Sequence, residues 1–277
     1  MKTSTDHYQV VGNPIAHSLS PQIHQQFAAQ TQQALHYDKQ LVELEDFAAA
    51  MDAFIQHGGK GVNITVPFKQ DAWQYADQRS KRAERAGALN TLKINADGST
   101  FGDNTDGLGL VRDLTQNQHI ALKGQRILLL GAGGAVRGVL QPLLEQQPAL
   151  LHIANRTASK AEALALDFAD LGKLNGSGFA ELENLEPFDL IINGTAASLS
   201  GELPPLPERI LITKGSAYDM MYSQTPTAFV QWAWQHGAAK AVDGLGMLVE
   251  QAAEAFLLWR GVRPNSLAVM KTLRPEG

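Results

Sequence analysis

The segment RILLLGAGGAVRGVL, residues 126–140, constrains the fold of this chain more than any other stretch. An apolar run of strand length passes into a loop with three glycines and then into a helical pattern. A strand that is apolar throughout is typical of a parallel sheet covered on both faces. The segment therefore predicts a strand–loop–helix unit of an α/β fold, and such a unit usually opens a domain of its own.

Further strand patterns alternate with amphipathic helical patterns along almost the whole chain, which favours an α/β architecture with largely parallel sheet. Strands are expected at residues 7–12, 35–42, 61–66, 91–96, 126–131, 150–155, 190–194 and 216–221. Helices are expected at residues 21–31, 45–57, 68–78, 106–117, 134–146, 158–169, 225–236 and 246–260.

The 277 residues are enough for one large domain or two domains of ordinary size. We place a boundary near Thr105, just ahead of the helix that leads into the glycine-loop unit. Residues 1–105 then form a first domain and residues 106–244 a second. Because the second sheet gains no strands after about Leu245, residues 245–277 are expected to return to the first domain.

Composition limits the classes of partner and chemistry. The net charge of −5 argues against nucleic acid as the main partner, and the absence of cysteine excludes thiolate nucleophiles and cysteine-ligated metals. The eight histidines have no metal-binding spacing, so no metal site is expected. With neither a signal-peptide pattern nor a membrane-spanning stretch in the sequence, a cytoplasmic protein is the expectation.

The glycine loop consists of Gly131, Ala132, Gly133, Gly134 and Ala135. Glycines allow a tight turn and a close approach of the backbone to a pyrophosphate, which then lies at a positive helix N-terminus. Val136 stands where the usual motif has its third glycine. The loop predicts a dinucleotide site, and the alternative is a tight turn that binds nothing.

The strand after this loop unit ends in Asn155, Arg156 and Thr157, with Lys160 one helical turn further on. A site for NAD would carry an acidic residue near this point, for the ribose hydroxyls. A guanidinium and a hydroxyl suit a 2′-phosphate instead, which favours NADP. The alternative interpretation is a solvated basic turn.

The run GVNITVPFK, residues 61–69, carries polar residues on one face of an expected strand. Val62, Ile64 and Val66 alternate with Asn63 and Thr65, so the polar pair needs water or a ligand. Lys69 follows in the first turn of a helix, where the helix dipole disfavours a cation. Lys69 is therefore either solvated or kept for function.

Further polar residues stand in turns at the ends of expected elements. Ser20 precedes Pro21 and is expected to be a helix N-cap, while Ser18 and Ser20 together could bind a carboxylate. Asn90 lies in a turn before a strand. Asp106 lies in the polar turn 102–107, and a pairing with Lys69 would hold the lysine in place.

The helix near the C-terminus presents Met247 and Gln251 on one face, because they are four residues apart. Met247 would suit contact with a flat ring, and Gln251 could bond a hydroxyl group. The alternative is that Met247 is ordinary core and Gln251 lies at the surface.

Eight ordered segments together resemble the shikimate dehydrogenase family over essentially the whole chain. These segments are GNPIAHSLSP, GVNITVPFK, GALNT, GDNTDG, GAGGA, NRT, YDMMY and DGLGMLVEQAAEAFLLWRG. The resemblance implies an N-terminal α/β substrate domain, a doubly wound Rossmann-type domain for NADP and a C-terminal helix that returns to the first domain. It also implies reversible reduction of 3-dehydroshikimate to shikimate, in the biosynthesis of chorismate and the aromatic amino acids.

The resemblance also assigns roles to individual positions. It implies that Ser18 and Ser20 hold the substrate carboxylate and that Lys69 and Asp106 form the catalytic pair, both in contact with substrate. The other substrate contacts that it implies are Asn63, Thr65, Asn90, Tyr222 and Gln251. The cofactor contacts that it implies are Gly131, Ala132, Gly133, Gly134, Ala135, Asn155, Arg156, Thr157, Lys160, Met220, Gly244 and Met247.

Three alternatives stay open at this point. A quinate/shikimate dehydrogenase would use NAD as well as NADP, which Arg156 and Thr157 disfavour. A catalytically silent sensor on the same scaffold would not need both Lys69 and Asp106. A dehydrogenase of another metabolite would not need the paired serines. We expect a small-molecule substrate, no nucleic-acid or membrane partner, and a homodimer.

Overall fold

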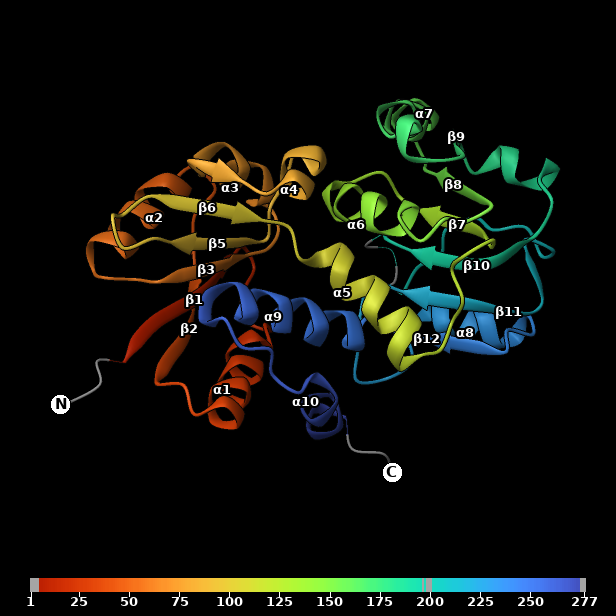
Figure 1. Cartoon of the computed structure of the whole chain (residues 1–277). Helices are drawn as coiled ribbons and strands as arrows, with labels where there is room; N and C mark the ends of the chain where they lie inside the picture. The colour runs from red at the N-terminus through yellow and green to blue at the C-terminus, as the bar shows by residue number, and fades with distance from the viewer. Residues whose placement is uncertain (1–4, 196, 198–200, 275–277) are drawn as a thin grey trace. The chain divides into compact units, whose positions relative to one another are not determined.

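The computed structural model describes residues 5–195, 197 and 201–274. The chain forms two compact units: residues 1–109 with 249–277, and residues 110–248. The chain passes from the first unit to the second within helix α5 (Asp106–Arg112), and it returns within helix α9 (Leu245–Arg260) (Figure 1).

The first unit is built on a mixed six-stranded sheet in the order β2-β1-β3-β5-β6-β4. The strands are β1 (Asp6–Gly12), β2 (Leu35–Leu41), β3 (Gly61–Ile64), β4 (Gln78–Arg79), β5 (Thr91–Ile94) and β6 (Thr100–Asp103). β1 runs parallel to β2 and β3, with Val10 opposite Asn63, whereas β5 is antiparallel to both β3 and β6. β3 and β6 therefore point the same way, and their carboxyl ends lie at one edge of the sheet.

The alternation predicted for the run 61–69 holds within β3. Val62 and Ile64 are buried in an apolar cluster with Phe68 and Leu92, and Asn63 lies on the opposite face. The prediction was wrong for Val66, whose side chain is 65% exposed. The strand ends at Ile64 because the chain turns there, with the Phe68 N–H donating to the Thr65 carbonyl at 3.0 Å.

Five helices of the described residues accompany this sheet, together with the part of α9 that belongs to the first unit. They are α1 (Ser20–Thr31), α2 (Phe47–Gln56), α3 (Lys69–Tyr75), α4 (Lys81–Ala86) and α10 (Ser266–Leu273). The return of the C-terminal segment to this unit is visible in α9, where Trp259 donates to the carbonyl of Leu92 at 3.1 Å.

The predicted N-cap role of Ser20 was wrong. Helix α1 already begins at Ser20, and Leu19 occupies the N-cap position without a capping side chain. The Ser20 N–H donates instead to Oγ of Ser18 at 3.3 Å. Ser18 therefore supplies the hydroxyl oxygen that accepts this first-turn N–H. It can do so because Ser18 lies two residues before the start of the helix.

The second unit contains an all-parallel six-stranded sheet in the order β12-β11-β10-β7-β8-β9. Its strands are β7 (Arg126–Leu130), β8 (Leu150–Ala154), β9 (Leu174–Ser177), β10 (Phe188–Asn193), β11 (Leu211–Asp219) and β12 (Lys240–Val242). This strand order is the doubly wound arrangement of a Rossmann fold. β7 lies at the centre, and the switch point of the sheet lies between β7 and β10.

Helices cover both faces of this second sheet (Figure 1). One apolar cluster joins the sheet to α6 (Gly134–Leu144) and α7 (Ala158–Asp167), and it includes Met220 and Met247. The other cluster joins it to α8 (Ala228–Gln235). Because both faces are covered, the central strand β7 is buried and apolar from Ile127 to Leu130.

The structure confirms the predicted fold class, and it corrects the details. β4, β6, β9, β12, α4 and α10 were not predicted, and the first sheet is mixed rather than largely parallel. The predicted helix 106–117 is an α-helix only as far as Arg112 and continues as a π-helix, Asp113–Asn117. Across the described ranges, every helix is too short or too polar to cross a membrane.

Candidate active site

Lys69 and Asp106 form an ion pair at the carboxyl edge of the first sheet. Lys69 is the first residue of α3 and follows β3, and Asp106 is the first residue of α5 and follows β6. Because β3 and β6 point the same way, their two following helices start side by side. Nζ of Lys69 lies 2.5 Å from Oδ2 of Asp106, with 17% of the lysine side chain and 9% of the aspartate side chain exposed.

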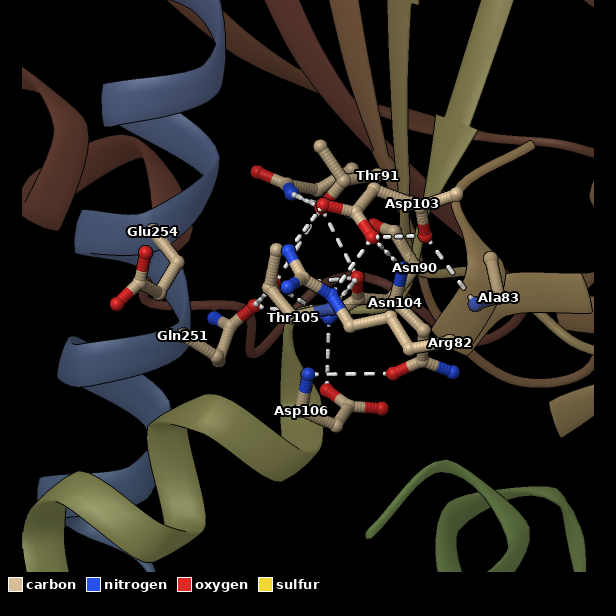
Figure 2. Close-up of polar contacts among 12 residues, drawn as sticks. Arg82, Ala83, Asn90, Thr91, Asp103, Asn104, Thr105, Asp106, Gln251 and Glu254 are labelled. Atoms are coloured by element: carbon tan, nitrogen blue, oxygen red, sulfur yellow. Dashed lines mark hydrogen bonds and ion pairs between the residues drawn. The ribbon is translucent and has the colours of Figure 1, made fainter. Parts of the chain in front are cut away.

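Asn90, just before β5, connects this pair to the surrounding side chains (Figure 2). Its amide nitrogen lies 2.7 Å from Oδ1 of Asp106, 3.0 Å from Oγ1 of Thr105 and 3.1 Å from Oε1 of Gln251. Its amide oxygen accepts the Thr105 N–H at 2.9 Å. Asn90 is 3% exposed, so these contacts fix the orientation of its amide.

Asn63 is held by a tyrosine that sequence analysis did not single out. The Tyr37 hydroxyl donates to Oδ1 of Asn63 at 2.7 Å, and the Asn63 amide donates to Oγ1 of Thr91 at 3.1 Å. Burial raises the pKa of Tyr37 well above its ordinary value, so the phenol remains a donor. Thr65 follows two residues after Asn63, at the same edge of the sheet.

A buried aspartate supports the loop that carries Asp106 (Figure 2). Oδ1 of Asp103 accepts from Nε of Arg82 at 2.8 Å and from the Asn104 N–H at 2.8 Å, and Arg82 also forms an ion pair with its second oxygen. Oδ1 of Asn104 in turn accepts the Asp106 N–H at 3.2 Å. This chain of contacts fixes the first residue of α5, and with it the acidic partner of Lys69.

Apart from Thr65, the predicted substrate residues of the first unit therefore fall into two groups. Asn63, Asn90, Asp106, Lys69 and Gln251 belong to one connected network with Thr91 and Thr105. Ser18 and Ser20 lie together at the start of α1, after β1. Tyr222 belongs to the second unit, where burial raises its pKa, and its contact with substrate stays a prediction.

The glycine loop of the second unit lies at the switch point of the sheet, after β7. Gly131 has φ +106°, a conformation that favours glycine, and its Cα faces the Gly194 carbonyl after β10. At Gly133 and Gly134 an added Cβ would meet open space, so a ligand can approach the backbone there. Helix α6 has no side-chain cap, which leaves its first-turn N–H groups to bind an anion.

The turn after β8 carries the predicted cations. Arg156, Thr157 and Lys160 are exposed, and Asn155 braces the turn by donating to the Thr157 carbonyl at 3.0 Å. Thr157 is the N-cap residue of α7, yet its side chain makes no capping bond. A hydroxyl and two cations at a helix start have the donor set that a 2′-phosphate requires. The residues present therefore fit NADP.

Met220, Gly244 and Met247 lie close together in the second unit. Met220 and Met247 belong to one buried cluster, and a Cβ on Gly244 would lie 2.3 Å from the Met220 carbonyl oxygen. The segment before α9 therefore packs directly on the backbone that follows β11.

Comparison with known proteins gives matches along nearly the whole chain. Residues 10–92 match the shikimate dehydrogenase substrate binding domain, residues 113–200 match shikimate / quinate 5-dehydrogenase, and residues 244–274 match the shikimate 5′-dehydrogenase C-terminal domain. The shikimate dehydrogenase (NADP(+)) of Alkalilimnicola ehrlichii is 60% identical over 98% of this chain and 100% of its own. The chain belongs to the shikimate dehydrogenase family.

Solved structures agree with this membership. An Ael1 enzyme from Pseudomonas putida is 46% identical, with a TM-score of 0.90 over 97% of this chain and 98% of its own. The shikimate 5-dehydrogenase of Thermus thermophilus, in complex with NADP(H) and shikimate, is 32% identical, with a TM-score of 0.87 over 98% of this chain and 99% of its own. The predicted family and fold class are confirmed, and the predicted NADP cofactor agrees with the names of these relatives.

Membership of the shikimate dehydrogenase family leaves the role of each residue as a prediction. Sequence analysis missed Tyr37, Thr91, Thr105 and the Arg82–Asp103 pair, which surround the predicted residues. Thr91 and Thr105 lie within the motifs GALNT and GDNTDG, so their position beside Asn90 and Asp106 was a usable signal. Tyr37 and Arg82 gave no such signal in the sequence. Tyr37 lies in an ordinary strand pattern, and Arg82 lies in an ordinary charged segment.

Proposed function

We propose that this chain catalyses the reversible, NADP-dependent reduction of 3-dehydroshikimate to shikimate, with Lys69 and Asp106 as its catalytic pair. The observation that carries the proposal is the 2.5 Å ion pair between these residues, set among amide and hydroxyl groups at one sheet edge. A hydroxylated ring needs such a dense set of donors and acceptors, and a reacting oxygen needs a proton donor beside it.

The amides of the first unit are proposed to bind the hydroxyls of the ring. Asn63, Asn90 and Gln251 come from three separate segments and share one hydrogen-bond network, so their orientations are fixed before substrate arrives. Thr65 supplies a further hydroxyl. Ser18 and Ser20 at the start of α1 are proposed to hold the substrate carboxylate, which the positive end of the helix also attracts.

Lys69 is proposed to donate a proton to the carbonyl oxygen of 3-dehydroshikimate. NADPH, when bound, supplies the hydride that the ketone carbon receives. The lysine ammonium then gives its proton to the oxygen, so that a C–H and an O–H bond replace the carbonyl double bond, and solvent returns a proton to the amine. Asp106 holds the ammonium in place and offers its second oxygen to a neighbouring ring hydroxyl. In shikimate oxidation, the Lys69 amine accepts the proton of the reacting hydroxyl while the ring carbon gives up its hydride, and Asp106 keeps the lysine in place.

The second unit is proposed to bind NADP. Backbone N–H groups of residues 131–135 and the first turn of α6 face the pyrophosphate, and Arg156, Thr157 and Lys160 face the 2′-phosphate. Met220, Gly244 and Met247 are proposed to contact the nicotinamide, and Tyr222 to contact the substrate. The cytoplasmic location and the homodimer stay predictions.

Initial rates with shikimate or quinate, each with NADP⁺ or NAD⁺, test the proposal. The expected result is turnover largely confined to shikimate with NADP⁺. Comparable rates with quinate and NAD⁺ would contradict it in favour of a dual-specificity enzyme, a class that the match of residues 113–200 also covers. Intact ligand binding without turnover in any combination would point to a sensor.

A further inference from the structure

A buried carboxylate in the second unit plays no part in the chemistry described above. Asp113, the first residue of the π-helix, has no solvent exposure. Its Oδ2 accepts from the Tyr218 hydroxyl at 2.6 Å, and its Oδ1 accepts from the Asn117 amide at 2.9 Å. π-Helical turns are rare, and they are frequent at functional sites.

The Tyr218 hydroxyl connects this carboxylate to the start of α9. It donates to Asp113 and accepts the backbone N–H of Met247 at 3.2 Å, a first-turn donor that the helix itself cannot satisfy. Burial, followed by the nearby Asp113 charge, raises the pKa of Tyr218 well above its ordinary value. The phenol therefore stays protonated. Its O–H group donates to the Asp113 carboxylate, and its oxygen accepts the Met247 N–H of α9.

Two glycines let the start of α9 come this close. A Cβ on Gly246 would lie 2.1 Å from Oδ1 of Asp113, and a Cβ on Gly244 would lie 2.3 Å from the carbonyl oxygen of Met220. The first turn of α9 is thus pressed against the carboxylate on one side and against the strand end of β11 on the other. At Gly244 the contact is with backbone, and at Gly246 it is with the Asp113 carboxylate, which Tyr218 and Asn117 hold in place.

We propose that Asp113 and Tyr218 are positioning residues for the nicotinamide end of the cofactor. They hold the first turn of α9, and with it Met247, at the distance from Met220 that the nicotinamide requires. The inference rests on the proposed nicotinamide contact of Met220 and Met247. It predicts that the pair affects binding of the nicotinamide half of NADP⁺ and not binding of the adenosine half, which the residues after β8 hold.

Calorimetric titration of Tyr218→Phe with two probes tests this prediction. NADP⁺ carries the nicotinamide, and adenosine 2′,5′-bisphosphate lacks it but keeps the 2′-phosphate. We expect the Kd for NADP⁺ to rise about fivefold, the loss that one hydrogen bond corresponds to, and the Kd for the bisphosphate to stay within about twofold of wild type. The KM for NADP⁺ should rise in parallel, and the KM for shikimate should not change.

Tyr75→Phe is the matched control, because the Tyr75 hydroxyl also bonds an aspartate, Asp52, at 2.6 Å, but in the first unit and near the surface. It should change neither Kd. Gly246→Ala provides a second variant that keeps both hydrogen-bonding side chains and displaces the helix start. It should weaken NADP⁺ binding and spare the bisphosphate, as Tyr218→Phe does.

Equal weakening of both probes in these variants would show a general loss of structure and would overturn the inference. Unchanged NADP⁺ binding in a folded Tyr218→Phe protein would also overturn it. The wild-type titration distinguishes a failure of this inference from a failure of the proposed function. If wild-type protein bound NADP⁺ no better than the bisphosphate, the proposed nicotinamide contact of Met220 and Met247 would itself be wrong.

Discussion

Replacing Lys69 by alanine removes the proposed proton donor and leaves the rest of the site in place. Asp106 keeps the Asn90 amide at 2.7 Å, and the Asn63, Thr91 and Asn90 contacts do not involve the lysine. A lost general acid typically lowers the rate by about 10²–10⁴, which corresponds to roughly 2.7–5.5 kcal/mol of transition-state stabilisation. We therefore expect kcat to fall by that factor while the KM for shikimate changes much less.

The effect of the same substitution on stability should be small by comparison. Breaking a fully buried ion pair costs about 3–5 kcal/mol, but 17% of the Lys69 side chain is exposed and Asn90 still serves the carboxylate. A loss of roughly 1–2 kcal/mol in the free energy of unfolding is the expected result. The variant should therefore remain folded at ambient temperature.

Steady-state kinetics in both directions, together with urea unfolding, measure these two quantities. Lys60→Ala is the matched control, because Lys60 is exposed and directly precedes β3, at the opposite end from Lys69. It should leave kcat unchanged. A folded Lys69→Ala enzyme with near-normal kcat would refute the proton-donor role, and a loss seen only in KM would reduce Lys69 to a binding residue.

Three further predictions concern the cofactor, the loop before α5 and the buried histidine. Arg156→Asp should raise the KM for NADP⁺ by about 10–100-fold and leave the KM for NAD⁺ nearly unchanged, since it removes a charge-assisted contact with the 2′-phosphate; initial rates measure this. Arg82→Ala should lower the free energy of unfolding by roughly 2 kcal/mol in urea titrations, because it leaves the 4%-exposed Asp103 carboxylate without its guanidinium. His24 is buried and stacked on the Tyr37 ring at 4.3 Å, and burial lowers its pKa to about 3. The unfolded chain therefore binds a proton below about pH 6.5 that the folded protein excludes down to about pH 3, so stability falls as the pH drops through that window. Between pH 7 and pH 5, wild type should lose about 2 kcal/mol more unfolding free energy than His24→Phe.

Each of these predictions has an outcome that contradicts it. Equal weakening of NADP⁺ and NAD⁺ by Arg156→Asp would mean that Arg156 does not contact the 2′-phosphate. Unchanged unfolding of Arg82→Ala would mean that the ion pair with Asp103 contributes no net stability. Parallel pH curves for wild type and His24→Phe would mean that His24 takes up its proton in the folded state.

The glycine loop and its strand could be predicted from sequence because their pattern is local. The apolar residues 126–130 and the glycines that follow need no knowledge of distant residues to predict a parallel sheet and a turn. The same holds for the polar face of β3, where Asn63 alternates with Val62 and Ile64. In each case the period of the side chains carries the information.

The meeting of Lys69 with Asp106 could not be derived in this way. It depends on the short strand β6 and on β5 running antiparallel between β3 and β6, and a four-residue strand gives too little pattern to predict. The contact of Asp113, where the α-helix changes to a π-helix, with the distant Tyr218 was also hidden. Contacts between residues far apart in the chain decide both features, and only the structure reveals them.

A crystal structure with shikimate and NADP⁺ bound would test the central claim most directly. We expect the substrate carboxylate on the hydroxyls of Ser18 and Ser20, and the hydroxyl oxygen on the carbon that is oxidised within hydrogen-bond distance of Nζ of Lys69. A substrate bound the other way round, with its carboxylate paired to Lys69, would contradict it.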